Sequence, residues 1–321
     1  MDKKILRTFI TYLQSQQTAQ QFLRQCYQKI NVTDAETKSY ENCNAFMYYL
    51  EHGQQFYDSG KKGKPLLQPI LYFYGMVHLI KACLLAKRPD YPESTMMLAH
   101  GVSTRKRKKR DYTFMQDEVK LQLHGLFPYF SEHLFSIRSF PFEKVKMHDL
   151  IALIPEIAPL FHFKKQEKLA IIGVGDSSVL EFPISLLDNY HLTVRSFVNR
   201  IQTYLPKITD KKSNQSSIHI ELVRPLTTSF GPFFMHGIDR TIHFPVSREH
   251  FLHISEVMVH YLILYNLSML SRYETEWWGD LLATKPDIDY PFITQFLHIT
   301  SEKVPYMLWQ ELYHMYLDTT Q

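Results

Sequence analysis

The stretch from Arg248 to Tyr273, REHFLHISEVMVHYLILYNLSMLSRY, constrains the fold more than any other part of the chain. Its apolar side chains recur at a helical period but occupy most of the helix circumference, a pattern typical of a helix that neighbours cover. The stretch is too short and too polar to span a membrane. We therefore expect a central helix over residues 248–273, against which other helices pack.

Four polar side chains in this stretch follow one another at steps of four, three and four residues: Glu249, His253, Glu256 and His260. On a helix they form one stripe. Two histidines and two carboxylates on one face are suited to a divalent ion, but this spacing is not a zinc or di-iron signature. The sequence therefore assigns neither a metal site nor a cofactor.

Composition indicates a globular chain with a substantial core, since 45% of its 321 residues are hydrophobic and its net charge is only +4. The three cysteines, Cys26, Cys43 and Cys83, lie in apolar helical patterns, which indicates reduced thiols and a cytoplasmic protein. The most membrane-like segment, residues 69–86, contains His78 and Lys81 and fits a buried helix better than a membrane span. We expect no membrane partner.

Helical patterns lie at both ends of the chain and strand-like patterns lie between them. The expected fold is α+β, mainly α, with a bundle built from N- and C-terminal helices and an inserted mixed α/β lobe. The expected parts are 1–100 and 247–321 for the bundle, and 101–246 for the basic loop and the lobe. The expected helices are 4–29, 39–59, 65–87, 126–136, 147–160, 193–204, 274–283, 289–300 and 302–317. The expected strands are 119–123, 169–174, 179–182, 217–223 and 241–244.

A His-Gly pair followed by six consecutive cationic residues, RKRKKR at 105–110, suggests a site for an anion. Glycine lets the backbone approach a phosphate closely, and cations neutralise it. The alternatives are a solvated basic loop, a paired core histidine at 78, and a lysine at 81 whose ammonium reaches the surface. The candidate anion-binding residues are His100, Gly101, Arg105, Lys106, Arg107, His78 and Lys81.

Two further patterns have structural interpretations. Gly75, within the expected helix 65–87, predicts close approach of another helix. Arg272 and Glu276, beside Tyr273, Trp277 and Trp278, suggest an ion pair held between aromatic rings at the end of the central helix.

Several segments together resemble the YaaC-like proteins of Bacillus and its relatives. They are ENCNAFMYYLEHGQQFY, KPLLQPILYFYGMVHLIKACLL, the His100-Gly101 pair with the basic run, and LILYNLSMLSRYETEWW. The resemblance covers nearly the whole chain. It implies a cytoplasmic bacterial protein, and it implies no particular activity because none is established for that family.

The helical parts resemble, more distantly, the HEPN superfamily of compact helical bundles, which includes RNases and nucleotide-binding or partner-binding modules. The RNases of that group carry an arginine, four to six residues, and then a histidine. Arg248 and His253 match this spacing. The resemblance implies a metal-independent RNase in which His253 acts on the 2′-hydroxyl and Arg248 stabilises charge on the phosphate. The alternative is that Arg248 and Glu249 are surface residues of the first helical turn and that His253 is merely partly buried.

The sequence therefore predicts a protein that binds RNA or a nucleotide through a HEPN-like bundle and the basic loop. Metal-independent RNase activity is a candidate function. The alternative is a non-catalytic module for protein–protein interaction or dimerisation.

Overall fold

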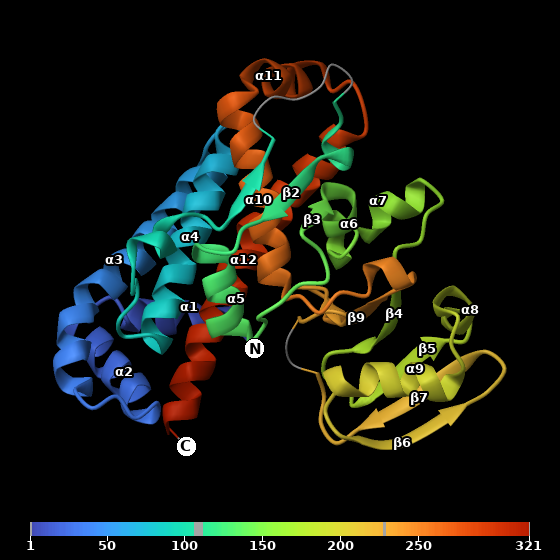
Figure 1. Cartoon of the computed structure of the whole chain (residues 1–321), viewed down its shortest axis with the longest axis horizontal. Helices are drawn as coiled ribbons and strands as arrows, with labels where there is room; N and C mark the ends of the chain where they lie inside the picture. The colour runs from blue at the N-terminus through green and yellow to red at the C-terminus, as the bar shows by residue number, and fades with distance from the viewer. Residues whose placement is uncertain (1, 106–111, 227–228, 321) are drawn as a thin grey trace. The chain divides into compact units, whose positions relative to one another are not determined.

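The computed structural model describes residues 2–105, 112–226 and 229–320 (Figure 1). Helices predominate over a few short sheets, which confirms the expected α+β, mainly α, fold class. The chain divides into two compact units: unit 1 comprises Met1–Val145 and His260–Gln321, and unit 2 comprises Lys146–Val259. Residues 101–145, which the sequence grouped with the inserted lobe, cluster with unit 1.

The long helices of unit 1 come from both ends of the chain. Helix α3 (Ala35–Lys62) packs against α2 (Gln16–Lys29) and α4 (Gln68–Lys87). Helix α12 (Asp289–Thr320) packs against α1 (Lys3–Tyr12), α2 and α4. The two ends of the chain therefore fold together, as the expected bundle requires (Figure 1).

Helix α4 is the one helix among the described residues that is long and apolar enough to cross a membrane by length and composition. Most of its side chains are buried. Helices α3, α5 (Leu126–Phe135) and α12 pack against it. We therefore place α4 as a core helix, and its polar His78 and Lys81 lie within a closely packed unit.

Gly75 allows the close approach between α3 and α4 that the sequence predicts. A Cβ atom built on Gly75 would lie 2.8 Å from Cδ2 of Tyr57 on α3, which is shorter than van der Waals contact. The ring of His78, less than one turn after Gly75, stacks on Phe56 of α3 with centroids 5.6 Å apart. The glycine thus helps to form a tight helix pair around His78.

Shorter elements complete unit 1. Strands β1 (Val102–Thr104) and β2 (Glu118–Leu121) pair antiparallel, and β3 (Lys144–Lys146) follows β2 in a three-stranded sheet. Helix α10 (Glu256–Tyr273) begins in unit 2 and continues into unit 1, and α11 (Thr275–Thr284) follows it.

Unit 2 contains two further three-stranded sheets with the orders β4-β9-β8 and β5-β7-β6, in which all neighbouring strands are antiparallel. Its strands are β4 (Leu169–Val174), β5 (Val179–Pro183), β6 (Ile208–Ser213), β7 (Ser217–Leu222), β8 (Phe234–Met235) and β9 (Thr241–Pro245). Its helices are α6 (Met147–Ile151), α7 (Ala158–Phe163), α8 (Leu186–Tyr190) and α9 (Val194–Ile201).

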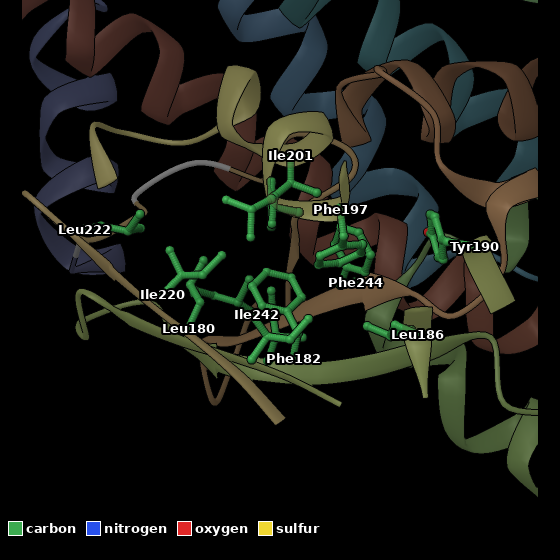
Figure 2. Close-up of a cluster of buried hydrophobic side chains, with 14 of the residues drawn as sticks. Leu180, Phe182, Leu186, Tyr190, Phe197, Ile201, Ile220, Leu222, Ile242 and Phe244 are labelled. Atoms are coloured by element: carbon green, nitrogen blue, oxygen red, sulfur yellow. The ribbon is translucent and has the colours of Figure 1, made fainter. Parts of the chain in front are cut away.

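An aromatic and aliphatic core joins the two sheets of unit 2 to α8 and α9 (Figure 2). Alternate residues of a strand point to the same face, so β5 directs Leu180 and Phe182 into this core. Phe182 contacts Phe197 of α9 edge to face at 5.4 Å and Phe244 of β9 at 5.3 Å between ring centroids. Unit 2 therefore has a hydrophobic core of its own.

The central helix begins later than the sequence predicts. Residues 248–250 form a 3₁₀ turn, residues 251–254 are not helical, and α10 starts at Glu256. Ser255 forms a β-bridge with Phe230, which keeps the preceding backbone extended. Its hydroxyl accepts a hydrogen bond from the backbone N–H of Val257 at 3.3 Å, as a helix cap does. The apolar period continues across this cap, so periodicity alone predicts a helix that begins too early.

Three other expected helices have wrong boundaries. Residues 147–160 form α6, a 3₁₀ turn at residues 155–157 and the start of α7 rather than one helix. Residues 4–29 form two helices because Ser15 caps α2 by accepting a hydrogen bond from the N–H of Thr18. Residues 289–300 and 302–317 belong to one helix, α12, which contains Pro305 in its interior. Between the two expected ranges, the hydroxyl of Ser301 donates back to the carbonyl of His298 and the helix continues without a break.

Candidate functional site

Four cationic or imidazole side chains from three parts of unit 1 share one electrostatic environment. We call His78 and Lys81 of α4, His100 of the segment before β1, and Arg272 of α10 the imidazole–cation cluster. The charges of Arg272 and Lys81 both act on His100, and that of Lys81 also acts on His78. Three of these residues, His78, Lys81 and His100, were predicted from the sequence as anion-binding residues.

His78 lies between aromatic rings of α3. It stacks on Phe56 and meets the ring of His52 edge to face at 5.3 Å. Its Nδ1 atom is buried and has no hydrogen-bond partner within the described residues. Burial, and then the positive charge of Lys81, lower the pKa of His78 to about 4. The ring is therefore neutral at physiological pH.

Lys81 is partly buried beside the same rings. Its ammonium nitrogen lies 5.6 Å from the ring centroid of Tyr49, within range of a cation–π interaction. Burial lowers the pKa of Lys81. Among the described residues no acidic side chain forms an ion pair with it, so a partly desolvated positive charge is left without a counter-ion.

His100 is held by contacts to two helices. Its ring meets Phe73 at 5.0 Å and Tyr265 at 5.7 Å, both edge to face. Its carbonyl oxygen accepts hydrogen bonds from the hydroxyl of Tyr261 at 2.8 Å and from the N–H of Phe127 at 3.1 Å. Burial, and then the charges of Arg272 and Lys81, lower the pKa of His100. The backbone that carries the ring is thus fixed on both sides.

Gly101 has a structural reason to be glycine. Its φ is +76°, and a Cβ atom there would lie 2.5 Å from Cδ of Pro128. Gly125, with φ of +118°, packs directly against it. These contacts shape the turn that presents His100, and the contribution of Gly101 to anion binding stays a prediction.

Arg272 is the member of the cluster whose role the sequence reasoning missed. The expected ion pair with Glu276 is not formed among the described residues. The Nε of Arg272 donates to the carbonyl of Ser268 at 2.9 Å, and its guanidinium lies 5.5 Å from the ring centroid of Tyr273. Arg272 lies seven residues after Tyr265, so a helix places both side chains on one face. That spacing is the sequence signal that could have linked Arg272 to the cluster.

The basic run is only partly described. Arg105 is exposed directly after β1 and lines a hollow of about 550 Å³ that also contains the cationic Lys120 and Lys144 and the acidic Asp117 and Glu118. Lys106 and Arg107 lie outside the described residues. Their predicted contact with an anion stays a prediction.

The predicted RNase pair lies in unit 2. Arg248 is exposed in the 3₁₀ helix η5 (Arg248–His250). His253 is exposed in the segment before α10, where its ring lies 5.1 Å from that of Tyr204 and 4.9 Å from that of Phe230. Partial desolvation by these rings lowers the pKa of His253, although the side chain stays largely exposed.

The stripe considered for a metal ion does not exist as predicted. Only Glu256 and His260 are on α10, whereas Glu249 is in η5 and His253 is in non-helical backbone. His260 donates or accepts a hydrogen bond with Thr300 at 2.9 Å and stacks on Phe296. It therefore packs against α12.

The fold and the cluster define a mainly helical α+β protein whose helical unit holds two partly buried cations, Lys81 and Arg272, that form no ion pair with another described residue. The family model described as YaaC-like Protein matches residues 11–312. The chain therefore belongs to the YaaC-like family, as its sequence segments indicated. Neither the curated proteins nor the solved structures contain a significant match.

Proposed function

We propose that this protein binds the phosphate groups of RNA or of a nucleotide, in the cytoplasm, at the imidazole–cation cluster. The observation that carries the proposal is the accumulation of positive charge around His100, to which both Lys81 and Arg272 contribute. Partial burial of a cation without a counter-ion costs free energy of hydration. A bound phosphate would offset that cost by supplying the missing negative charge.

The aromatic side chains around the cluster favour a ligand that also carries a base. Tyr49 lies beside Lys81, and Tyr74 lies 6.2 Å from His100 between ring centroids. Both rings are partly buried. Bases of single-stranded RNA and of nucleotides stack on such rings, while neighbouring cations bind the phosphates.

The proposal has a catalytic extension and a non-catalytic alternative. The extension is metal-independent RNA cleavage by Arg248 and His253 in a HEPN-like protein, and it is supported by their spacing and by the exposure of both side chains. The basic run is proposed to strengthen RNA binding through its charge. The alternative is a module that docks a protein partner or a second copy of the chain.

Replacement of Lys81 and Arg272 tests anion binding. Anisotropy of a fluorescent single-stranded RNA and of a fluorescent ATP analogue gives the affinity of the parent, Lys81→Gln and Arg272→Gln proteins. We expect each replacement to weaken binding by about tenfold, because each removes a charge-assisted contact to phosphate. Lys62→Gln, at an exposed position near the end of α3, is the control for loss of charge alone.

The outcomes separate the proposals. Binding of the ATP analogue but not of RNA would identify a mononucleotide site, and the reverse would identify an RNA site. Equal affinities in all four proteins, or no binding of either probe by the parent, would refute the cluster as a phosphate site. If the parent binds neither probe, a mass from light scattering that corresponds to a dimer or a larger assembly would favour the interaction module.

Cleavage is tested separately with the same RNA in the presence of EDTA. If the catalytic extension holds, the parent cleaves RNA and the Arg248→Ala, His253→Ala double variant loses at least about a hundredfold in rate, since both groups act on the transition state. Cleavage that persists in the double variant would assign the activity elsewhere. Absence of cleavage in the parent would leave a binding protein only.

A further inference from the structure

Two histidines and an aspartate that the sequence did not single out converge in unit 2. His148 and Asp149 are on α6, and His250 is the last residue of η5. Nδ1 of His148 lies 3.1 Å from Oδ1 of Asp149, and Nε2 of His250 lies 3.6 Å from the same oxygen. One donor atom from each residue lies within 4.8 Å of the other two.

His250 is the strongest indication that this group is built to hold something. Its side chain is only 5% exposed, and its Nε2 has no hydrogen-bond partner within the described residues. The distance of 3.6 Å to Asp149 is too long for a hydrogen bond. Buried polar atoms almost always have a hydrogen-bond partner, so a buried nitrogen held beside a carboxylate at ion-pair range but beyond hydrogen-bond distance is suited to an additional ligand.

The other ring nitrogen of His250 is already positioned. Nδ1 lies 2.8 Å from the hydroxyl oxygen of Ser247. If Nδ1 carries the proton and donates it to Ser247, the lone pair of Nε2 faces Asp149. Histidines that bind metal ions commonly donate their second N–H to an oxygen in this way, which fixes the ring and the tautomer. The ring of His148 is in turn supported edge to face by Phe161 at 5.5 Å.

We propose that His148, Asp149 and His250 form a binding site for a divalent transition-metal ion, with zinc as the best-fitting ion. Two imidazole nitrogens and one carboxylate oxygen are ligands that zinc accepts. Tetrahedral bonds of about 2.0–2.1 Å place ligand atoms about 3.3 Å apart. The distances of 3.1 and 3.6 Å around Asp149 lie close to that value, and the two imidazole nitrogens lie within 4.8 Å of each other, so binding of the ion would draw them together.

Three protein ligands leave the fourth tetrahedral position for water or another small ligand. The side chains of His148 and Asp149 are 32% and 42% exposed, so this position is accessible from solvent. The competing explanation is a protonated His250 that forms an ion pair with Asp149 and needs no metal. Direct measurement of metal binding distinguishes the two.

The test is isothermal titration of Zn²⁺ into the full chain after metals are removed with a chelator. We expect one high-affinity equivalent in the parent, and a loss of at least about tenfold in affinity for Asp149→Asn and His250→Ala. Asp149→Asn removes the charge but keeps the shape of a partly exposed side chain, so it tests the site even if His250→Ala does not fold. Circular dichroism establishes that each variant is folded.

A second readout identifies the ligands. Co²⁺ in a four-coordinate site with nitrogen and oxygen ligands absorbs visible light strongly, and this absorption should disappear in Asp149→Asn. The matched control is His191→Asn, which removes an exposed histidine of unit 2 at a positive-φ position that asparagine tolerates. Zinc binding that is absent from the parent, or equal in the parent and Asp149→Asn, would overturn the proposal in favour of the ion pair.

Discussion

A Gly101→Ala variant is expected to lose about 2–5 kcal/mol of the free energy of unfolding. A non-glycine residue in the left-handed region costs about 1–2 kcal/mol, and Gly101 has φ of +76°. Overpacking adds about 1–3 kcal/mol, because the new Cβ would lie 2.5 Å from Cδ of Pro128 and 2.9 Å from the backbone nitrogen of Phe127. Neither atom is the end of a flexible side chain that can move aside.

Chemical denaturation followed by circular dichroism measures this loss. The matched control is Gly279→Ala in α11, where a Cβ would meet nothing within 4 Å. There, the higher helix propensity of alanine should raise stability by up to about 1 kcal/mol. The same substitution is thus expected to act in opposite directions at the two positions. A Gly101→Ala protein as stable as the parent would show that the backbone before β1 is not confined as described.

The same glycine shows where sequence reasoning succeeds and where it stops. The His100-Gly101 pair stands out because glycine beside a basic run suggests phosphate binding. The structure adds a packing reason, close contact with Gly125, that no local pattern reveals because the two glycines belong to different segments. A glycine required by packing and one required by a ligand look identical in the sequence.

The helical repeat of the sequence predicts the relative position of two members of the cluster, His78 and Lys81. His78 and Lys81 are three residues apart on a helix that the apolar pattern predicts, so their shared face follows from geometry alone. The approach of His100 and Arg272 depends on tertiary contacts, such as the hydrogen bond from Tyr261 to the carbonyl of His100. Those residues are far apart in the chain, and local propensity carries no information about such pairs.

The metal-ligand group was missed for the same reason. His148 and Asp149 are adjacent, but His250 is far along the chain, and no short motif joins them. The helix expected over residues 248–273 would place His253 and His260 on one face, and so it favours these two histidines over His250 as metal ligands. Because α10 begins after the cap at Ser255, His250 and His253 precede the helix and only His260 lies on it.

The stability of unit 1 is expected to fall as the pH is lowered from 6.5 towards 4, in part because of His78. The pKa of His78 is about 4 in the folded protein and about 6.5 in an unfolded chain. Below pH 6.5 the unfolded state takes up a proton that the folded state does not accept until the pH approaches 4. Protonation therefore favours unfolding across this window, and the contribution of His78 is lost progressively as the pH falls.

A His78→Phe variant should show a shallower loss of stability over the same window. A pKa difference of this size would correspond to about 3 kcal/mol for a fully buried group, and partial exposure reduces the expected effect to roughly 1–2 kcal/mol. Other groups also titrate in acid, so the informative quantity is the difference between the parent and variant curves of unfolding free energy against pH.

Tyr49→Phe is the matched control for that comparison. Tyr49 belongs to the same group of rings, 5.9 Å from His78 between centroids, but burial raises its pKa, so the phenol stays neutral throughout the acidic window. Its replacement is expected to displace the stability curve without changing its slope. Parallel curves for the parent and His78→Phe would mean that His78 is solvated in the folded protein. The imidazole–cation cluster would then lack the desolvation on which anion binding beside His78 depends.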